Sequence, residues 1–254
     1  MAHPLDGARL KLARAQEHIN AFGEESVPYL NSKFCRLDFR DEGDFRNVFL
    51  VVTEPPPIRL SAILGDCVHN IRASLDHLAW QLVIANQSTP NSNTAFPIFA
   101  SKDKYRDSIA RITAGMKDTA ITRIEELQPY HKGDVRQSLL WFLYELDNED
   151  KHRALNLTQG RIIPADARIT TNQSTVAPAW IASGVLHDGA KVGAFRLADY
   201  SPEDYVKMEA DATSLITLED SGPWGKEPII NLAVRALNYV GDEVFPRFES
   251  FFPK

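Results

Sequence analysis

Residues 58–85 read IRLSAILGDCVHNIRASLDHLAWQLVIA, and this stretch decides the fold. Its apolar residues recur at alternating intervals of four and three positions, which is the spacing of one face of an α-helix. The Glu54-Pro55-Pro56-Pro57 segment in front of it interrupts regular structure, so a long amphipathic helix is predicted over 58–85. Its apolar stripe consists of Leu64, Val68, Ile71, Leu75, Leu78 and Leu82.

The regions on both sides of this helix contain further helical patterns. Leu139 to Tyr144 are apolar on every side, and a helix without a polar face belongs in the middle of a bundle. Pro246 is expected to end the last helix, because proline cannot continue the backbone hydrogen bonding. With 58–85, these segments predict a helical bundle. Helices are predicted over 4–22, 102–115, 119–127, 134–157 and 227–245.

Strand-like patterns occur in two parts of the chain. Residues 34–40 alternate apolar and polar side chains, residues 45–53 are rich in Val and Phe, and Asp41 to Asp44 give a hairpin turn signal between them. Because a single hairpin is too small to be stable alone, we expect it to join strands that follow residue 160. These later strands are predicted over 167–172, 180–186, 190–198 and 205–218.

The fold class that follows is α+β, a helical bundle packed with an antiparallel β-sheet. Its 254 residues, with 44% hydrophobic and 24% charged side chains, describe an ordinary globular protein and exclude disordered chains, collagen and coiled-coil rods. We expect residues 1–254 to form one α+β domain. Within it the bundle core spans 58–157, the β-rich part spans 33–54 and 160–220, and the C-terminal helix spans 227–245.

The charge of the chain limits its binding partners, and its cysteine content indicates its cellular compartment. With 28 basic and 34 acidic residues the net charge is −6, which argues against an electrostatic grip of the whole chain on nucleic acid and leaves only a local basic cleft. Cys35 and Cys67 are far apart and are expected to be reduced thiols. Since the sequence lacks both the apolar core of a signal peptide and an apolar run of about 18 residues, we predict a cytoplasmic protein with no membrane segment.

Two polar stretches on predicted helices carry the candidate chemistry. The first is the face of the 58–85 helix opposite its apolar stripe. The second runs from Asp147 to Arg153, seven consecutive polar residues directly after an apolar helix. Each stretch is explained either by a solvated helix face or by the lining of a site, and the return of apolar residues after Arg153 favours a pocket for the second. The polar face of the first helix consists of His69, Asn70, Asp76, His77 and Trp80.

The Arg72-x4-His77 element of the first stretch resembles the HEPN superfamily, whose members are helical-bundle proteins. Many of them are metal-independent ribonucleases of toxin–antitoxin and phage-defence systems. The resemblance implies an enzyme of this kind, with RNA as substrate, no cofactor, and a composite active site across a homodimer. Ala73 stands where a polar residue often follows the arginine in that family.

Under this interpretation His77 is a general acid or base, and Arg72 stabilises the phosphate as it gains charge. Five positions correspond to roughly 140° around a helix, so the two side chains converge only if the phosphate lies between two protomers. The interpretation therefore requires a homodimer. The predicted catalytic residues are Arg72, Asp76, His77 and His152, and the predicted substrate-binding residues are Asn70, Lys151 and Arg153.

A second interpretation concerns two carboxylate-x-x-His pairs on two predicted helices, Asp66-x-x-His69 and Glu149-x-x-His152. In ferritin-like di-iron bundles, Glu-x-x-His pairs from two helices join carboxylates from two others, because the spacing aims both ligands inward. The alternative function is therefore a di-metal carboxylate protein that binds Fe or Mn through these four side chains.

A third interpretation needs no catalysis. The protein would be a helical interaction module whose polar clusters fix the register of its helices. Trp80 and the other tryptophans are expected to be core or interface anchors rather than base-stacking residues, because no basic residues interleave with them. Both catalytic interpretations share one spatial prediction: the 58–85 helix packs on the 134–157 helix and brings Asp150 or His152 within reach of its polar face.

Overall fold

The structure is a computed structural model of the chain, and it has the predicted α+β fold. It describes residues 3–32, 35–163, 168–170, 175–176, 180–182, 184–196, 207–209, 213–219 and 222–253. The chain divides into two compact units, a helical one and a β-rich one, where the sequence predicts both parts within one domain. The helical unit comprises Met1–Glu24, Ile58–Leu155 and Ile230–Lys254, and the β-rich unit comprises Glu25–Pro57 and Asn156–Ile229.

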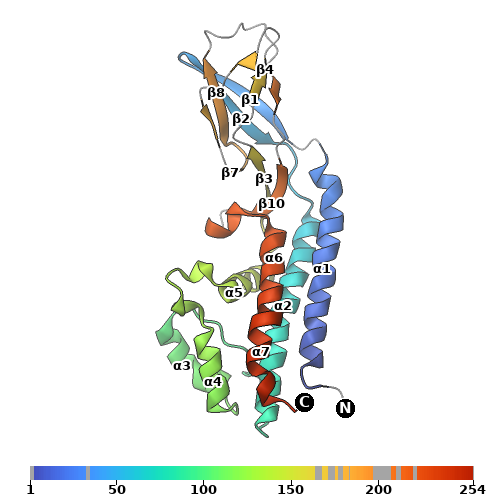
Figure 1. Cartoon of the computed structure of the whole chain (residues 1–254), viewed down its shortest axis with the longest axis vertical. Coiled ribbons are helices and arrows are strands. Elements are labelled where there is room, and N and C mark those ends of the chain that lie inside the picture. The colour runs from blue at the N-terminus through green and yellow to red at the C-terminus, as the bar shows by residue number, and fades with distance from the viewer. Residues whose placement is uncertain are drawn as a thin grey trace. The chain divides into compact units, whose positions relative to one another are not determined.

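The helical unit is a bundle built around α2. Figure 1 shows α1, α2, α6 and α7 running alongside one another, with α3, α4 and α5 to one side. Short 3₁₀ turns connect or follow several of these helices, as at Pro129–His131 and Glu249–Phe251. The α-helices are α1 (Asp6–Leu30), α2 (Ile58–Ala85), α3 (Lys102–Ile112), α4 (Asp118–Glu126), α5 (Leu139–Asp150), α6 (Ile229–Asn238) and α7 (Phe245–Phe248).

The apolar stripe of α2 forms the centre of the helical core, as predicted. Each of its six members is at most 2% exposed. Helix α2 packs on α5, so the predicted packing of these two helices is confirmed. Each large aliphatic side chain that is fully buried in this way contributes about 1.5–3 kcal/mol to stability. The buried apolar residues of α5 are Leu140, Phe142, Leu143 and Leu146.

Helix α5 is shorter than the predicted 134–157 segment. Its N-terminal neighbour Ser138 has extended backbone, with φ −87° and ψ 124°, and Val135–Gln137 forms a separate 3₁₀ turn. After Asp150 the chain turns and enters strand β3 (Leu157–Ile163). The apolar residues beyond Arg153 therefore belong to an irregular segment and a strand, which have no helical periodicity to continue.

The C-terminal helix also differs from the prediction, because Pro246 does not end it. Tyr239–Val244 forms a π-helical segment between α6 and α7, and Pro246 lies in the first turn of α7. A proline in a first turn needs no N–H donor, and π-helical turns, although rare, occur within longer helices.

Helix α1 extends beyond the predicted residue 22, since Phe22, Ser26 and Tyr29 continue its buried face.

The β-rich unit contains the predicted hairpin. Strands β1 (Cys35–Glu42) and β2 (Phe45–Val52) pair antiparallel, and Gly43 in the turn has a φ of +57°, which glycine adopts readily. Strand β2 also pairs antiparallel with β8 (Lys191–Arg196), so the prediction that the hairpin joins later strands is confirmed. The sheet order is β1-β2-β8-β6.

Two further antiparallel sheets have the orders β10-β3-β7 and β5-β4-β9. The predicted strand over 180–186 is split in two, because its two ends pair with different sheets. Of the predicted strands, residues 34, 167, 171–172, 183, 197–198, 205–206 and 210–212 lie outside the described residues. The remaining strands are β4 (Arg168–Thr170), β5 (Thr175–Val176), β6 (Trp180–Ile181), β7 (Gly184–Leu186), β9 (Lys207–Glu209) and β10 (Thr213–Leu218).

Two expectations from composition can be compared with the structure. Cys35 and Cys67 form no disulfide with each other, and burial raises the pKa of Cys67 to about 12. Among the described helices, none combines the length and the apolar character that a bilayer crossing requires.

Candidate functional site

Arg72 of the predicted catalytic element anchors a neighbouring segment of the chain. Its Nη1 donates to Asp76 Oδ1 at 2.6 Å, and its Nη2 donates to the carbonyl oxygen of Phe96 at 2.9 Å. The backbone N–H of Phe96 donates in turn to Asp76 Oδ1 at 2.8 Å. The Arg72 side chain is only 13% exposed. Both terminal nitrogens of its guanidinium thus donate to acceptors within the protein.

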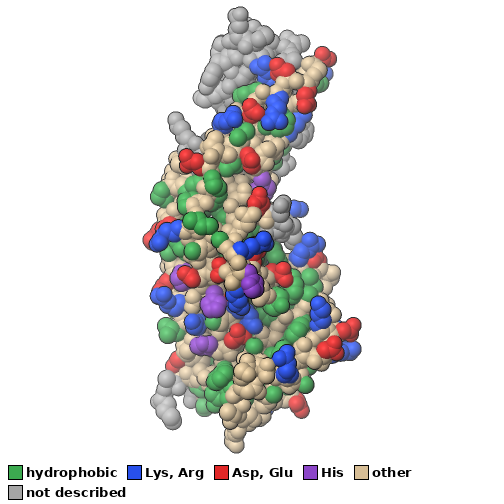
Figure 2. Space-filling view, turned by 180° about the vertical axis from the view of Figure 1, so that it is seen from behind, with side chains coloured by type: hydrophobic (Ala, Val, Ile, Leu, Met, Phe, Trp, Pro, Cys, Tyr) green, Lys and Arg blue, Asp and Glu red, His purple; other side chains and the backbone are tan. Residues whose placement is uncertain are grey.

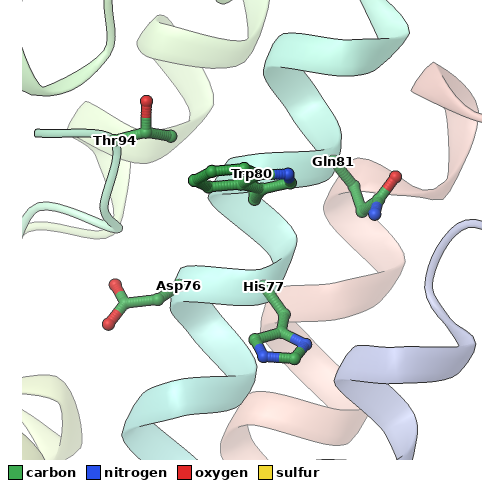
Figure 3. A pocket seen from close by; sticks show the side chains of 5 residues that line it. All are labelled: Asp76, His77, Trp80, Gln81 and Thr94. Atoms are coloured by element: carbon green, nitrogen blue, oxygen red, sulfur yellow. The ribbon is translucent and has the colours of Figure 1, made fainter. Parts of the chain in front are cut away.

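His77 is exposed and lines a cavity of about 390 Å³ on α2. Figure 3 shows that the ring of His77 and the carboxylate of Asp76 point to opposite sides of the helix. None of the described residues that line this cavity is Lys or Arg. The cavity therefore lacks the cation that a phosphate at His77 would need. Its lining consists of Asp76, His77, Trp80, Gln81 and Thr94.

A second histidine on α2, His69, lies within hydrogen-bond distance of a carboxylate. His69 Nδ1 lies 2.9 Å from Asp147 Oδ1, and Lys151 Nζ donates to Asp147 Oδ2 at 2.6 Å. The side chain of Asp147 is 4% exposed, whereas that of His69 is 56% exposed. A buried carboxylate that accepts from Nδ1–H fixes the orientation of the imidazole and leaves Nε2 as the proton acceptor.

Local periodicity explains why Asp147 is buried. Leu140, Leu143 and Asp147 follow one another at intervals of three and four on α5, so Asp147 occupies the next position of the buried face. His69 directly follows the buried Val68 at the edge of the α2 stripe. Packing of α2 on α5 therefore brings the carboxylate to the imidazole.

Asp150 lies against Gly65 and completes the polar cluster. A Cβ atom added to Gly65 would lie 2.0 Å from Asp150 Oδ1, so only glycine leaves room for this carboxylate. Burial raises the pKa of Asp150, repulsion by the Asp66 and Asp147 carboxylates raises it further, and His69 opposes the shift. The predicted approach of Asp150 to the polar face of α2 is confirmed.

The three predicted substrate-binding residues make different contacts in the structure. Asn70 donates from Nδ2 to the carbonyl oxygen of Asp66 at 2.8 Å and accepts from Lys11 Nζ of α1 at 3.5 Å. Lys151 contacts Asp147, as described above. Arg153 pairs instead with Glu149 at 3.1 Å, and its side chain is highly exposed. His152, predicted as catalytic, is exposed in the turn after α5.

The ligand pairing that the di-metal interpretation requires is not formed. The α5 carboxylates that face Asp66 and His69 are Asp147 and Asp150, while Glu149 pairs with Arg153. Helix α5 ends at Asp150, and His152 lies in the turn that follows, where its backbone N–H donates to the Glu149 carbonyl oxygen at 3.0 Å. Over the ranges that the structure describes, no three His, Cys, Asp or Glu side chains are arranged to hold one metal ion.

The sequence prediction left out Asp147 as a partner for His69, although the position of Asp147 on the apolar face of α5 was a usable signal. Of the two roles predicted for Trp80, core anchor and interface anchor, the 45% exposure of this side chain beside the cavity excludes only the first. Figure 2 shows His, Lys and Arg side chains gathered over the helical unit, with Asp and Glu among them.

Comparisons with protein-family models, with curated proteins and with solved structures give no match for this chain.

Proposed function

We propose that the protein is a metal-independent ribonuclease whose general base is His69, oriented by Asp147. One observation carries the proposal: a 2.9 Å contact joins an exposed imidazole to a buried carboxylate. Cys67 on the same helix is buried with a raised pKa, so it does not supply a nucleophile. RNA fits such a site because it carries its own nucleophile, the 2′-hydroxyl, and needs from the protein only a base, an acid and a cation.

Each of these three roles has a candidate within the cluster. His69 takes the proton of the 2′-hydroxyl, and the 2′-oxygen then forms a bond to phosphorus. The bond from phosphorus to the 5′-oxygen breaks, and Asp150, which keeps its proton to higher pH than an ordinary aspartate, donates that proton to the leaving oxygen. The products are a 2′,3′-cyclic phosphate and a free 5′-hydroxyl.

Lys151 supplies the positive charge. Its ammonium group lies 2.6 Å from Asp147 Oδ2, on the same carboxylate that holds His69. A fixed cation beside the base stabilises the additional negative charge that the phosphate acquires in the transition state. The His69, Asp147 and Lys151 side chains come from one chain, so this site does not depend on the homodimer that convergence of Arg72 and His77 would require.

Cleavage of a single-stranded RNA by the purified protein in excess EDTA tests the proposal. His69→Ala should lower the cleavage rate by about 10²–10⁴-fold, the usual contribution of general acid–base catalysis. His152→Ala is the matched control, because His152 is also exposed and lies next to Lys151 but contacts neither His69 nor Asp147. It should retain the activity of the unmodified chain.

Mass spectrometry of the products supplies a second criterion, since the proposal requires a 2′,3′-cyclic phosphate. Undiminished cleavage by the His69→Ala variant would overturn the proposal. Loss of cleavage on His77→Ala with no loss on His69→Ala would show that the general base is His77 of the predicted Arg72-x4-His77 element.

A further inference from the structure

The cavity beside Trp80 has features of a binding site that the proposed reaction does not use. We propose that it binds the ammonium group of a short aliphatic primary amine, which is held by the carboxylate of Asp76 and the indole of Trp80. The site lies on a different part of α2 from His69, and the inference does not depend on the proposed ribonuclease.

The charges around the cavity favour a positively charged ligand. Asp76 is among the residues that line it, and none of the described lining residues is Lys or Arg. Helix α2 ends at Ala85, four residues beyond the lining residue Gln81, and has no basic residue in its last turn. The C-terminal end of a helix carries a partial negative charge, which attracts a cation. This end of α2 therefore lacks a cation of its own.

Asp76 offers one carboxylate oxygen in a fixed position. Its Oδ1 accepts from both Arg72 Nη1 and the Phe96 backbone N–H, at 2.6 and 2.8 Å. Within the described part of the chain Oδ2 has no hydrogen-bond partner, and the Asp76 side chain is 39% exposed against 13% for Arg72. The negative member of the pair is thus the one that a ligand reaches. An ionised carboxylate only accepts hydrogen bonds, so Oδ2 selects a group that donates, such as a primary ammonium.

Trp80 supplies an aromatic surface beside this oxygen. Asp76 and Trp80 are four positions apart on α2, the spacing at which side chains are neighbours on the surface of a helix. Figure 3 shows the Asp76 carboxylate on one side of the indole ring and Thr94 on the other. The indole is 45% exposed, so its surface is open to a ligand. A cation within about 6 Å of an indole centroid is attracted by the ring, and tryptophan gives the strongest such contact.

The size of the cavity indicates an organic cation. Its volume is about 390 Å³, within the usual range for small-molecule sites. A metal ion would need more ligands than Asp76, and His77 points to the opposite side of the helix. A short alkyl chain can cover the apolar surface of Trp80 while its ammonium group stays at Asp76, as the stem of a lysine does on apolar surfaces. A free alkylamine and a lysine side chain share this chemistry.

NMR titration of the isotope-labelled full chain with butylamine tests the inference. The backbone amide signals of residues 76–81 should shift in a saturable manner. Butanol has the same chain length without the charge, and tetramethylammonium has the charge without a donor. Each should bind at least about tenfold more weakly than butylamine, because neither can form the charge-assisted hydrogen bond to Asp76.

Substitutions in α2 locate the site. Trp80→Ala should weaken butylamine binding by about two- to fivefold through the lost cation–π contact. Ile84→Ala is the matched control and should leave binding unchanged, because Ile84 is 46% exposed one turn beyond Trp80 but does not line the cavity. Asp76→Asn should weaken binding by about tenfold or more. Because Asp76 also holds Phe96, thermal unfolding checks that this variant folds, and Trp80→Ala decides alone if it does not.

Lysine with both its α-amino and carboxyl groups blocked as amides distinguishes the two sources of the ammonium group. Binding as tight as that of butylamine would support the inference for a lysine side chain, and weaker binding would support it for a free amine. Equal binding of butylamine and butanol, or no effect of Trp80→Ala on butylamine binding, would overturn it. His69→Ala should bind butylamine as the unmodified chain does, so failure of the ribonuclease assay leaves this result standing.

Discussion

Two acid–base pairs have their basic residues, His69 and Arg72, less than one helical turn apart on α2, and the two pairs have opposite exposure patterns. In the Arg72–Asp76 pair the basic side chain is 13% exposed and the acid 39%, whereas in the His69–Asp147 pair the base is 56% exposed and the acid 4%. A pair whose basic member is buried serves to hold structure together. A pair whose acidic member is buried presents an oriented base to solvent.

The origin of the difference lies in what covers each pair. Arg72 reaches the backbone of Phe96, a residue with no exposed surface, and the segment that carries Phe96 covers the guanidinium. His69 contacts Asp147 of α5, the last buried residue of that helix, and the turn that follows α5 is exposed. Chemistry at α2 is therefore expected at the second pair, and the following predictions test that contrast.

The largest expected effect concerns Asp147. Asp147→Asn should lower the rate of RNA cleavage by about 10²–10⁴-fold, because an amide no longer fixes the tautomer and orientation of His69. The measurement is the pH dependence of the cleavage rate, which should lose the limb that reports the oriented base. An unchanged rate and pH profile would show that the buried carboxylate does not assist His69.

The second effect concerns stability at the other pair. Arg72→Ala should lower the free energy of unfolding by about 2–3 kcal/mol, since it removes two charge-assisted hydrogen bonds and takes the guanidinium away from Asp76 and the Phe96 carbonyl. Urea denaturation measures this change. Arg9→Ala is the control: Arg9 is exposed in its pair with Glu249, so its loss should cost less than about 1 kcal/mol. A stable but inactive Arg72→Ala variant would restore the predicted catalytic role of this arginine.

The third effect concerns the fit of Asp150 against α2. Gly65→Ala should destabilise the protein by about 1–3 kcal/mol, because the new Cβ would collide with the Asp150 carboxylate and force α5 to shift. Gly23→Ala in α1 meets nothing within 4 Å and should stabilise the helix by about 0.5–1 kcal/mol. Equal effects of the two substitutions in urea denaturation would contradict the close approach of Asp150.

The smallest effect is the pH dependence of stability at Asp150. Burial and neighbouring carboxylates raise its pKa, so the folded state disfavours the ionised form. Ionised Asp150 therefore destabilises the folded protein above the folded pKa. Asp150→Asn should therefore raise Tm by a few degrees at most near neutral pH, and the gain should shrink as the pH falls and Asp150 itself becomes protonated.

Substitution of Asp134 is expected to change Tm in the opposite direction, and it serves as the control for that prediction. Its hydrogen bonds with Arg136 lower its pKa, so the ionised carboxylate stabilises the folded state above the unfolded pKa and this contribution is lost as the pH falls. Asp134→Asn should lower Tm slightly near neutral pH and have no effect in acid. Thermal unfolding at two pH values measures both variants.

The sequence by itself determined the local elements of this protein. The spacing of Leu64 to Leu82 fixes one buried face of α2, because a helix repeats its direction every 3.6 residues whatever surrounds it. The glycine at position 43 and the alternating residues around it likewise determine a hairpin, since turn geometry depends on adjacent residues. Element boundaries such as the end of α5 were less accurate, because they depend on where the chain enters the next element.

Only the tertiary structure decided which polar residues form a site. His69 and Asp147 are 78 positions apart, and their contact exists because the buried faces of α2 and α5 meet in one register. Arg72 became an anchor because the Phe96 segment happens to pass over it, which no spacing within α2 could reveal. Hydrogen bonds act over about 3 Å, so the role of a polar side chain depends on distant segments that packing brings close.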